Sequence, residues 1–250
     1  MAGKDGEMSF WDHLEVLRWT LLRSALAVVL LSLVFFCIPK TLFKAVLWPT
    51  AADFPLYRLP GVEFSMSLVN IELSTQFFVY MKMAVLCGLV LAFPYIIWEI
   101  WRFVAPALYE KEKKAVRTAF TLSSGLFYLG VAVGYFIVLP VCLMFFMNFS
   151  VSDKIVNTIS LNSYMSFFTS MVFLVGLLFE FPTVVVVLSN LGIFTRKHLK
   201  KYRKHAFIVM LILAAIITPT DPFSMIVLAI PLYGLYEISI LACKKDDIAQ

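Results

Sequence analysis

Long apolar runs alternate with short polar segments along the whole chain. Five of these runs approach or exceed the roughly 20 apolar residues that a helix needs to cross about 30 Å of hydrocarbon. They lie at about 19–38, 73–97, 118–147, 163–189 and 223–242. No internal repeat and no low-complexity tract separates them. The pattern predicts an all-α integral membrane protein in which residues 1–250 form a single domain.

A sixth, shorter run lies just before the last one. Its uninterrupted apolar part, Ala206–Ile217, holds 12 residues, and a helix of that length reaches only about 18 Å. The turn TPTDP at 218–222 joins it to the last run, and its two prolines favour the end of one helix and the start of the next. In the last run only the 14 residues of 223–236 precede Glu237. We therefore expect six transmembrane helices with two short last spans, at about 203–218 and 223–242, accommodated by local bilayer thinning or by longer neighbours.

Basic residues are distributed unequally between the segments that separate the runs. Sixteen of the 21 Lys and Arg lie on the side that takes the N-terminus, 98–117, 190–205 and the C-terminal tail, and four lie on the other side. By the positive-inside rule the first side is cytoplasmic, so we expect the N-terminus and the C-terminus in the cytoplasm. On the opposite side, the stretch KTLFKAVLWP at 40–49 has the spacing of a short amphipathic helix at the outer interface.

Composition agrees with a membrane location and argues against other classes. The chain is 61% hydrophobic and 15% charged, with a mean hydropathy of +0.89, whereas soluble domains are about 45–50% apolar and about 25% charged. The net charge of +5 does not indicate nucleic-acid binding, because the basic residues cluster between apolar runs, where membrane orientation explains them. H-E-x-x-H, G-x-S-x-G and phosphate-loop motifs are absent, and the three histidines lack metal-ligand spacing. We expect no enzymatic activity, no metal and no cofactor.

One acid lies deep inside an apolar run. Glu180 stands 17 residues into the fourth run and is followed by Phe181 and Pro182. A charge near the bilayer centre costs a few kcal/mol or more, so such a residue marks a function by default. The alternative is that Glu180 is protonated, or paired with Lys82 of the second run, and only holds helices together. The proline loosens the helical hydrogen-bond ladder, which favours a polar cavity at this depth.

Two further acidic positions have competing interpretations. Asp221, in the external turn, either caps the last helix by accepting its free backbone N–H groups or serves the function of the protein. The segment 98–117 reads WEIWRFVAPALYEKEKKAVR, an aromatic belt followed by a charged run. On the ordinary interpretation, Glu112 in this run is a solvated surface acid near the start of a helix.

Four separated motifs resemble the twin-arginine translocase subunit TatC. They are HLEVLR at 13–18, FVAPALYEKEKK at 103–114, EFP at 180–182 and ITPTDPFSMIVLAIPLYGLYEISI at 217–240. The resemblance implies a cup of six helices in the bacterial cytoplasmic (inner) membrane, with short last spans. It also implies a core receptor for the twin-arginine signal peptides of folded precursors. Such a receptor works in an oligomeric complex with TatA-like and TatB-like subunits, and the proton motive force drives transport.

The resemblance also assigns the binding residues. Carboxylates suit two consecutive arginines, because each guanidinium offers a planar fork that matches a carboxylate with two parallel hydrogen bonds. In the family the acid after APALY, here Glu112, forms part of this pocket, and the resemblance assigns Tyr109 and Arg18 to the same signal-peptide site. The N-terminal motif departs from the family pattern, because Val16 occupies the usual acidic slot and Glu15 stands one position earlier. Two further family acids, one intramembrane and one in the external turn, map to Glu180 and Asp221.

Two other functional classes are compatible with composition alone. A secondary transporter would use Glu180 as a proton-coupling site for a small solute. Inverted repeats with paired broken helices would favour that class, and the sequence has none. An intramembrane hydrolase would need a nucleophile and a base on facing helices, and no such pair is evident.

Overall fold

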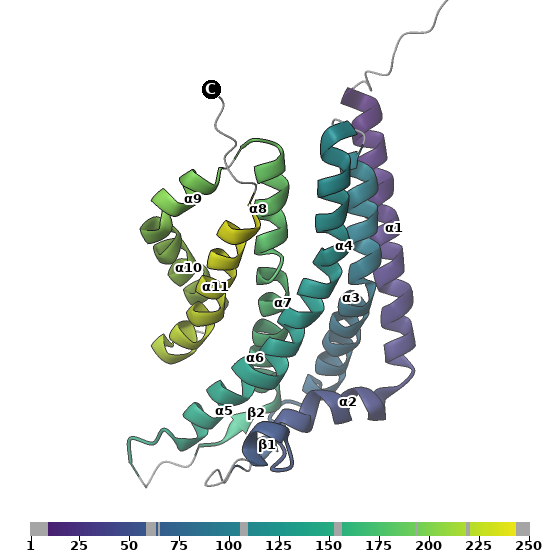
Figure 1. Ribbon diagram of the computed structural model, residues 1–250. Helices are drawn as coiled ribbons and strands as arrows, with labels where there is room; N and C mark the ends of the chain where they lie inside the picture. Colours follow the sequence, from purple (N-terminus) through teal and green to yellow (C-terminus); the bar gives the residue numbers. More distant parts are fainter. Residues whose placement is uncertain are drawn as a thin grey trace, which may run out of the picture.

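The computed structural model describes residues 10–58, 64, 66–105, 110–152, 157–193, 195–218 and 221–243. These residues form two groups of helices that meet at one end of the molecule and diverge toward the other (Figure 1). One group contains α1 (Phe10–Phe36), α3 (Thr75–Val104) and α4 (Glu110–Val133). We call the end that carries α2 (Pro39–Leu47) the outer end, and the end that carries the first turn of α1 the inner end.

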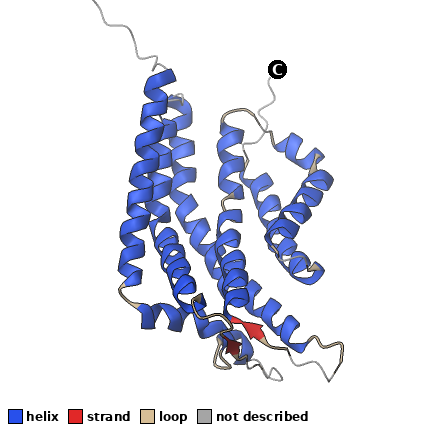
Figure 2. Ribbon diagram, turned by 180° about the vertical axis from the view of Figure 1, so that it is seen from behind, coloured by secondary structure: helices blue, strands red, loops and turns tan. Residues whose placement is uncertain are grey.

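Helices α1 and α3 lie side by side along most of their length (Figures 1 and 2). At Gly88 of α3 a Cβ atom would lie 2.9 Å from the Cα of Ser32, so this close approach requires glycine. Helix α1 nevertheless packs on one side only, since 6% of its most apolar 18 residues are buried, against 39% in each of the other four long spans. Most of the apolar surface of α1 is therefore left for lipid.

The segment between α1 and α3 closes the outer end. It contains α2 and the short 3-10 helices η1 (Trp48–Thr50) and η2 (Pro55–Arg58). Strands β1 (Leu68–Val69) and β2 (Ile159–Ser160) pair in parallel at this end (Figure 2). Three buried or half-buried tyrosines donate hydrogen bonds to carbonyl groups of the segment: Tyr57 to Pro49 at 2.9 Å, Tyr135 to Ala45 at 2.6 Å and Tyr164 to Val46 at 2.7 Å. Burial raises the pKa of Tyr57 far above its usual range, so its phenol remains a donor at neutral pH.

The two middle spans contain π-helical turns that the apolar pattern does not reveal. Helix α4 continues through η4 (Gly134–Val138) into α5 (Leu139–Asn148). Helix α6 (Leu161–Thr169) continues through η5 (Ser170–Leu174) into α7 (Val175–Leu178). The two π-helical segments pack against each other at Gly134, where a Cβ would lie 3.1 Å from the Cα of Val172. Pro140 follows η4 and has no N–H to donate, which accounts for the irregular hydrogen-bond ladder there.

The last part of the chain forms a helical hairpin. It consists of α9 (Arg196–Lys201), α10 (Arg203–Ile217) and α11 (Pro222–Ala242). Helix α10 has 15 residues, about 22 Å, and its last turn stops short of the level of α2 (Figure 1). Arg203 and Glu237 form an ion pair at 2.6 Å that joins α10 to α11.

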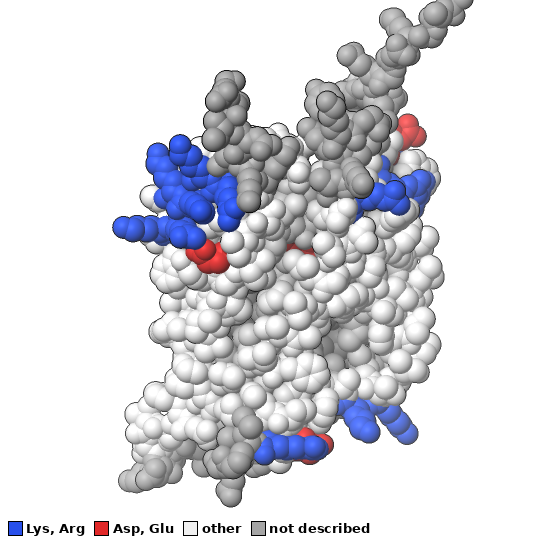
Figure 3. Space-filling view, viewed as in Figure 1, with Lys and Arg blue, Asp and Glu red and all other residues white. Residues whose placement is uncertain are grey.

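Five stretches of helix are long and apolar enough to cross a membrane. They are His13–Phe36, Thr75–Val104, Val116–Asn148, Leu161–Asn190 and Pro222–Ala242. The five long runs of the sequence are thus confirmed as helices, whereas α10 is shorter and the sixth crossing stays a prediction. Lys and Arg gather at the inner and outer ends, and the belt between them is almost free of charge on the face seen in Figure 3. This distribution fits a protein whose middle lies in hydrocarbon.

Candidate functional site

The helix that carries Glu180 is broken at this residue. Helix α7 ends at Leu178, and α8 (Phe181–Asn190) begins with Pro182 in its first turn. Proline is tolerated there because the first N–H groups of a helix have no partner within it. The Glu180 N–H donates to the Leu177 carbonyl at 3.0 Å, and the Glu180 carbonyl accepts from Val184 at 3.1 Å. The backbone bonds are therefore rerouted around the acid rather than lost.

The carboxylate of Glu180 faces α4. The hydroxyl of Ser123, which is fully buried, donates to one carboxylate oxygen. The other oxygen, Oε1, is buried and has no hydrogen-bond partner among the described residues. The alternative pairing with Lys82 is not formed. Lys82 is exposed on α3, and none of the ion pairs among the described residues includes it. The buried Thr183 of α8 also lies close to the carboxylate, so hydroxyl groups of both α4 and α8 stand beside Glu180.

Asp221 caps the last helix. Its Oδ2 accepts a hydrogen bond from the Ser224 N–H at 2.8 Å, so the capping interpretation is confirmed. The cap fixes the acid at the turn between α10 and α11.

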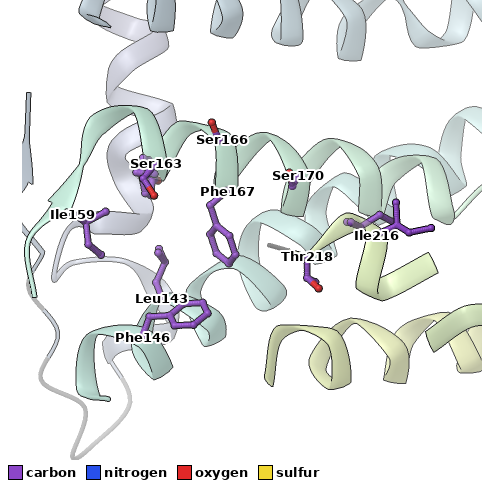
Figure 4. A pocket seen from close by; sticks show the side chains of 11 residues that line it. Leu143, Phe146, Ile159, Ser163, Ser166, Phe167, Ser170, Ile216 and Thr218 are labelled. Atoms are coloured by element: carbon purple, nitrogen blue, oxygen red, sulfur yellow. The ribbon is translucent and has the colours of Figure 1, made fainter. Parts of the chain in front are cut away.

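A cavity of about 540 Å³ lies between α5, α6 and the end of α10 (Figure 4). Three serines contribute hydroxyl groups along α6 and η5, namely Ser163, Ser166 and Ser170. The other lining residues are Leu143, Phe146, Ile159, Tyr164, Phe167, Ile216, Ile217 and Thr218. A serine nucleophile needs an adjacent base, and the described lining residues include no histidine, lysine or acid. The cavity therefore offers no catalytic arrangement.

The N-terminal residues predicted to bind arginines lie at the inner end. Glu15 and Arg18 are exposed in the first turns of α1. His13 faces α3, where its imidazole stacks on Phe103 with ring centroids 4.3 Å apart. Glu15, two positions further on, lies about 200° around the helix axis from His13. The Glu15 carboxylate therefore projects from the side of α1 that faces away from α3.

The other half of the predicted site is at the start of α4. Glu112 belongs to the first turn of α4, and its side chain lies outside the described part of the structure. Tyr109 lies outside the described residues altogether. The first turns of α1 and α4 are at the same end of the molecule (Figure 1). The two halves of the predicted site thus share the inner end.

The sequence reasoning missed a buried ionic cluster at the inner end. Glu99 of α3 is only 2% exposed and accepts a hydrogen bond from the Tyr95 hydroxyl at 3.1 Å. Arg102 lies 3.4 Å from its Oε1, and Arg23 of α1 lies 3.7 Å from its Oε2. One signal was available, because Arg23 interrupts the first apolar run and a charge inside a span needs a partner or a route to the interface. Glu99 itself stands beside Trp98 in WEIW, which has the appearance of an ordinary membrane interface.

Sequence comparisons place this chain near one family of membrane proteins. The family model for Sec-independent protein translocase protein (TatC) matches residues 12–231. The TatC protein of Blattabacterium sp. subsp. Periplaneta americana (strain BPLAN) is 36% identical over 256 residues, which cover 96% of each chain. The TatCy protein of Bacillus subtilis (strain 168) is 34% identical and covers 96% of this chain and 91% of its own.

Solved structures give the same result for the fold. A crystal structure of the twin arginine translocase receptor TatC superposes on this chain with a TM-score of 0.77 at 32% sequence identity. The match covers 92% of this chain and 97% of the chain in the crystal structure. A second, in DDM, has a TM-score of 0.79 at 33% identity, over 93% of this chain and 99% of its own. The likeness therefore extends over almost the whole length in both sequence and fold.

Proposed function

Because this chain belongs to the TatC family of Sec-independent protein translocases, we propose that it is a core receptor that binds the twin-arginine signal peptides of folded precursor proteins. As a member of that family it is a membrane component of a protein translocase and not an enzyme. The observation that carries the proposal is its likeness, at 32% identity over 92% of the chain, to a twin arginine translocase receptor.

The proposal includes the machinery around the receptor. TatA-like and TatB-like subunits join it in an oligomeric complex, and the proton motive force drives transport across the bacterial cytoplasmic membrane. Family membership supports the existence of a complex. The lipid-facing surface of α1, with only 6% of its most apolar residues buried, leaves area for the helices of such partners.

Recognition would take place at the inner end. Glu112 and Glu15 supply carboxylates, and Tyr109 and Arg18 complete the site. Each arginine of the signal can make two parallel hydrogen bonds to a carboxylate, whereas a lysine presents a compact ammonium group without that fork. The site should therefore distinguish two arginines from two lysines of equal charge.

The direct test compares two precursors on the purified, detergent-solubilised protein. We expect it to retain a precursor with an intact arginine pair and to bind the same precursor with two lysines about tenfold or more weakly. The reason is the loss of bidentate geometry at unchanged net charge. The measurement is the affinity of each labelled precursor in a pull-down. Equal affinities for the two precursors would contradict the proposed function.

Orientation is the second part of the proposal. We take the inner end to be cytoplasmic and the chain to cross six times, so that both termini lie in the cytoplasm and α10 and α11 form the last two spans. The sixteen basic residues on one side against four on the other support this orientation. The short α10 is compatible with a crossing where the bilayer is locally thin.

Cysteine labelling in intact cells tests the orientation. In a background where Cys37, Cys87, Cys142 and Cys243 are replaced by alanine, Asp53→Cys should react with an impermeant maleimide and Lys200→Cys should not. Both native side chains are exposed, so access depends only on the side of the membrane. Reaction of both after permeabilisation is the control for Lys200→Cys. Labelling of Lys200→Cys from outside would reverse or remove the proposed topology.

A further inference from the structure

Glu99 is a buried acid for which the proposed recognition chemistry has no direct use. In the described part of the chain it is the only charged residue that is buried. Its Oε1 accepts hydrogen bonds from the Tyr95 hydroxyl at 3.1 Å and from the Arg102 guanidinium at 3.4 Å. Its Oε2 has Arg23 at 3.7 Å and no hydrogen-bond partner among the described residues. The carboxylate therefore depends on two arginines, one from its own helix and one from α1.

Glu99 depends on the two arginines more than either arginine depends on Glu99. The side chains of Arg23 and Arg102 are 47% and 55% exposed, so either guanidinium can be hydrated without Glu99. A buried carboxylate has no such alternative, because its desolvation must be offset by a nearby cation or by hydrogen bonds. Arg23 is the one of these two cations that belongs to α1. The preference of Glu99 for a second cation therefore acts as a force that holds α1 against α3.

Besides this ion pair, the contacts described between α1 and α3 are mostly non-polar, among them the stacking of His13 on Phe103 and of Phe36 on Tyr80. Apolar contact with a neighbour gives little net attraction in a bilayer, since lipid tails are as apolar as leucine. At its outer end the Phe36 carbonyl accepts the Tyr80 hydroxyl. In the middle of the span Gly88 sets a close approach to Ser32, but the Ser32 hydroxyl donates to Val28 of its own helix. Toward the inner end, Glu99 and Arg23 provide the polar link.

Glu99 also lies where the two halves of the proposed arginine-pair site separate. From Arg23, α1 continues toward the inner end, with Arg18 about 8 Å and Glu15 about 12 Å further along the axis. From Glu99, α3 continues to Val104, and α4 begins at Glu110. A rotation or shift of α1 at this point would therefore move one half of the site relative to the other.

We propose that Glu99 is a positioning residue of this receptor. By binding Arg23 and Arg102 it fixes where α1 lies on α3, and so it sets the distance between the N-terminal half of the arginine-pair site and the half at the start of α4. The inference rests on the proposed function of the inner end. Glu99 does not contact the signal peptide.

Glu99→Gln is the test, because glutamine keeps the shape of the side chain and leaves two arginines that water can solvate. We expect normal membrane levels and a normal melting temperature. Affinity for the twin-arginine precursor should fall about tenfold, and the weak affinity for the twin-lysine precursor should not change. The matched control is Glu237→Gln, which removes a glutamate paired with Arg203 at 2.6 Å between α10 and α11 and should leave both affinities unchanged.

A cross-link reports the position of α1 without any precursor. His13→Cys with Phe103→Cys joins two side chains that are stacked in the structure, in the background without natural cysteines. On oxidation this pair should form a disulfide at a rate that reports how often the two backbones come within disulfide reach, and this rate should be several-fold lower when Glu99→Gln is added. Once the disulfide has formed in that variant, twin-arginine affinity should return to the value of the same locked protein with Glu99 intact.

Three outcomes would overturn the inference. They are an unchanged twin-arginine affinity in Glu99→Gln, an unchanged rate of disulfide formation, and a locked Glu99→Gln variant that still binds weakly. The last result would mean that Glu99 touches the signal peptide itself. If instead the unmodified protein does not distinguish the two precursors, the proposed function has failed, and the disulfide rate still reports separately whether Glu99 positions α1.

Discussion

Glu112→Gln should abolish recognition of the arginine pair. If Glu112 and a guanidinium form a partly buried bidentate pair, breaking it costs about 2 kcal/mol or more, which is over tenfold in affinity. A solvent-exposed ion pair would be worth under about 1 kcal/mol, so the size of the loss also reports whether the pocket is desolvated. The measurement is precursor affinity at constant salt. Should Glu112→Gln bind as tightly as the parent protein, the carboxylate pocket is wrong.

Precursor affinity should be measured for two variants of the N-terminal motif together with Glu112→Gln. Glu15 projects away from α3, so Glu15→Gln should weaken binding less than Glu112→Gln does. Val16 lies about 100° further around α1 and nearer to the face that packs on α3. Val16→Glu should therefore be tolerated or should improve affinity. A loss of binding in Val16→Glu as large as in Glu112→Gln would contradict this assignment of the two faces of α1.

Glu180→Gln should separate binding from transport. The acid lies at a break inside the fourth span and contacts Ser123, about 16 Å along α4 from Glu112, so precursor affinity should stay within about twofold. Transport into vesicles should fall about tenfold or more, since glutamine fills the same space but cannot carry the charge or exchange the proton of a carboxylic acid.

The conservative change provides the control for that experiment. Glu180→Asp keeps the acid on a side chain one methylene shorter and should retain more transport than Glu180→Gln. Ser123→Ala removes the hydroxyl that the carboxylate accepts and should have an intermediate effect. Normal transport by Glu180→Gln at normal expression would leave Glu180 with a purely structural role between α4 and α8.

Apolar length predicted the spans well and their ends less well. The apolar run at 19–38 covers only part of a helix that begins at Phe10. The apolar run at 73–97 likewise stops before its helix, which ends at Val104. In both cases polar or aromatic turns continue the helix beyond the hydrocarbon, where hydrophobicity no longer marks it. The π-helical turns η4 and η5 could not be predicted either, because each lies inside a long apolar run and the extra residue changes only the backbone path.

The residues of the candidate site also divide into those that could be predicted from the sequence and one that could not. Glu180 and Asp221 could be found from sequence, because an acid in an apolar run or between two prolines is locally conspicuous. Glu99 could not, since it follows Trp98 at the edge of a span, and its burial arises only from the packing of α3 in the fold. Burial that arises between helices distant in sequence is not marked around Glu99 itself, and the only sign of it in the sequence is Arg23 inside the first apolar run.

The sparse packing of α1 has a consequence for biogenesis. A helix that buries so little against its neighbours satisfies its own backbone in the bilayer, so it can leave the insertion machinery before α3 has been synthesised. Arg23 can meanwhile extend to the membrane surface, but Glu99 has its second cation only after α1 has docked. We therefore expect insertion of α1 and its docking on α3 to be separate events, with docking the later of the two.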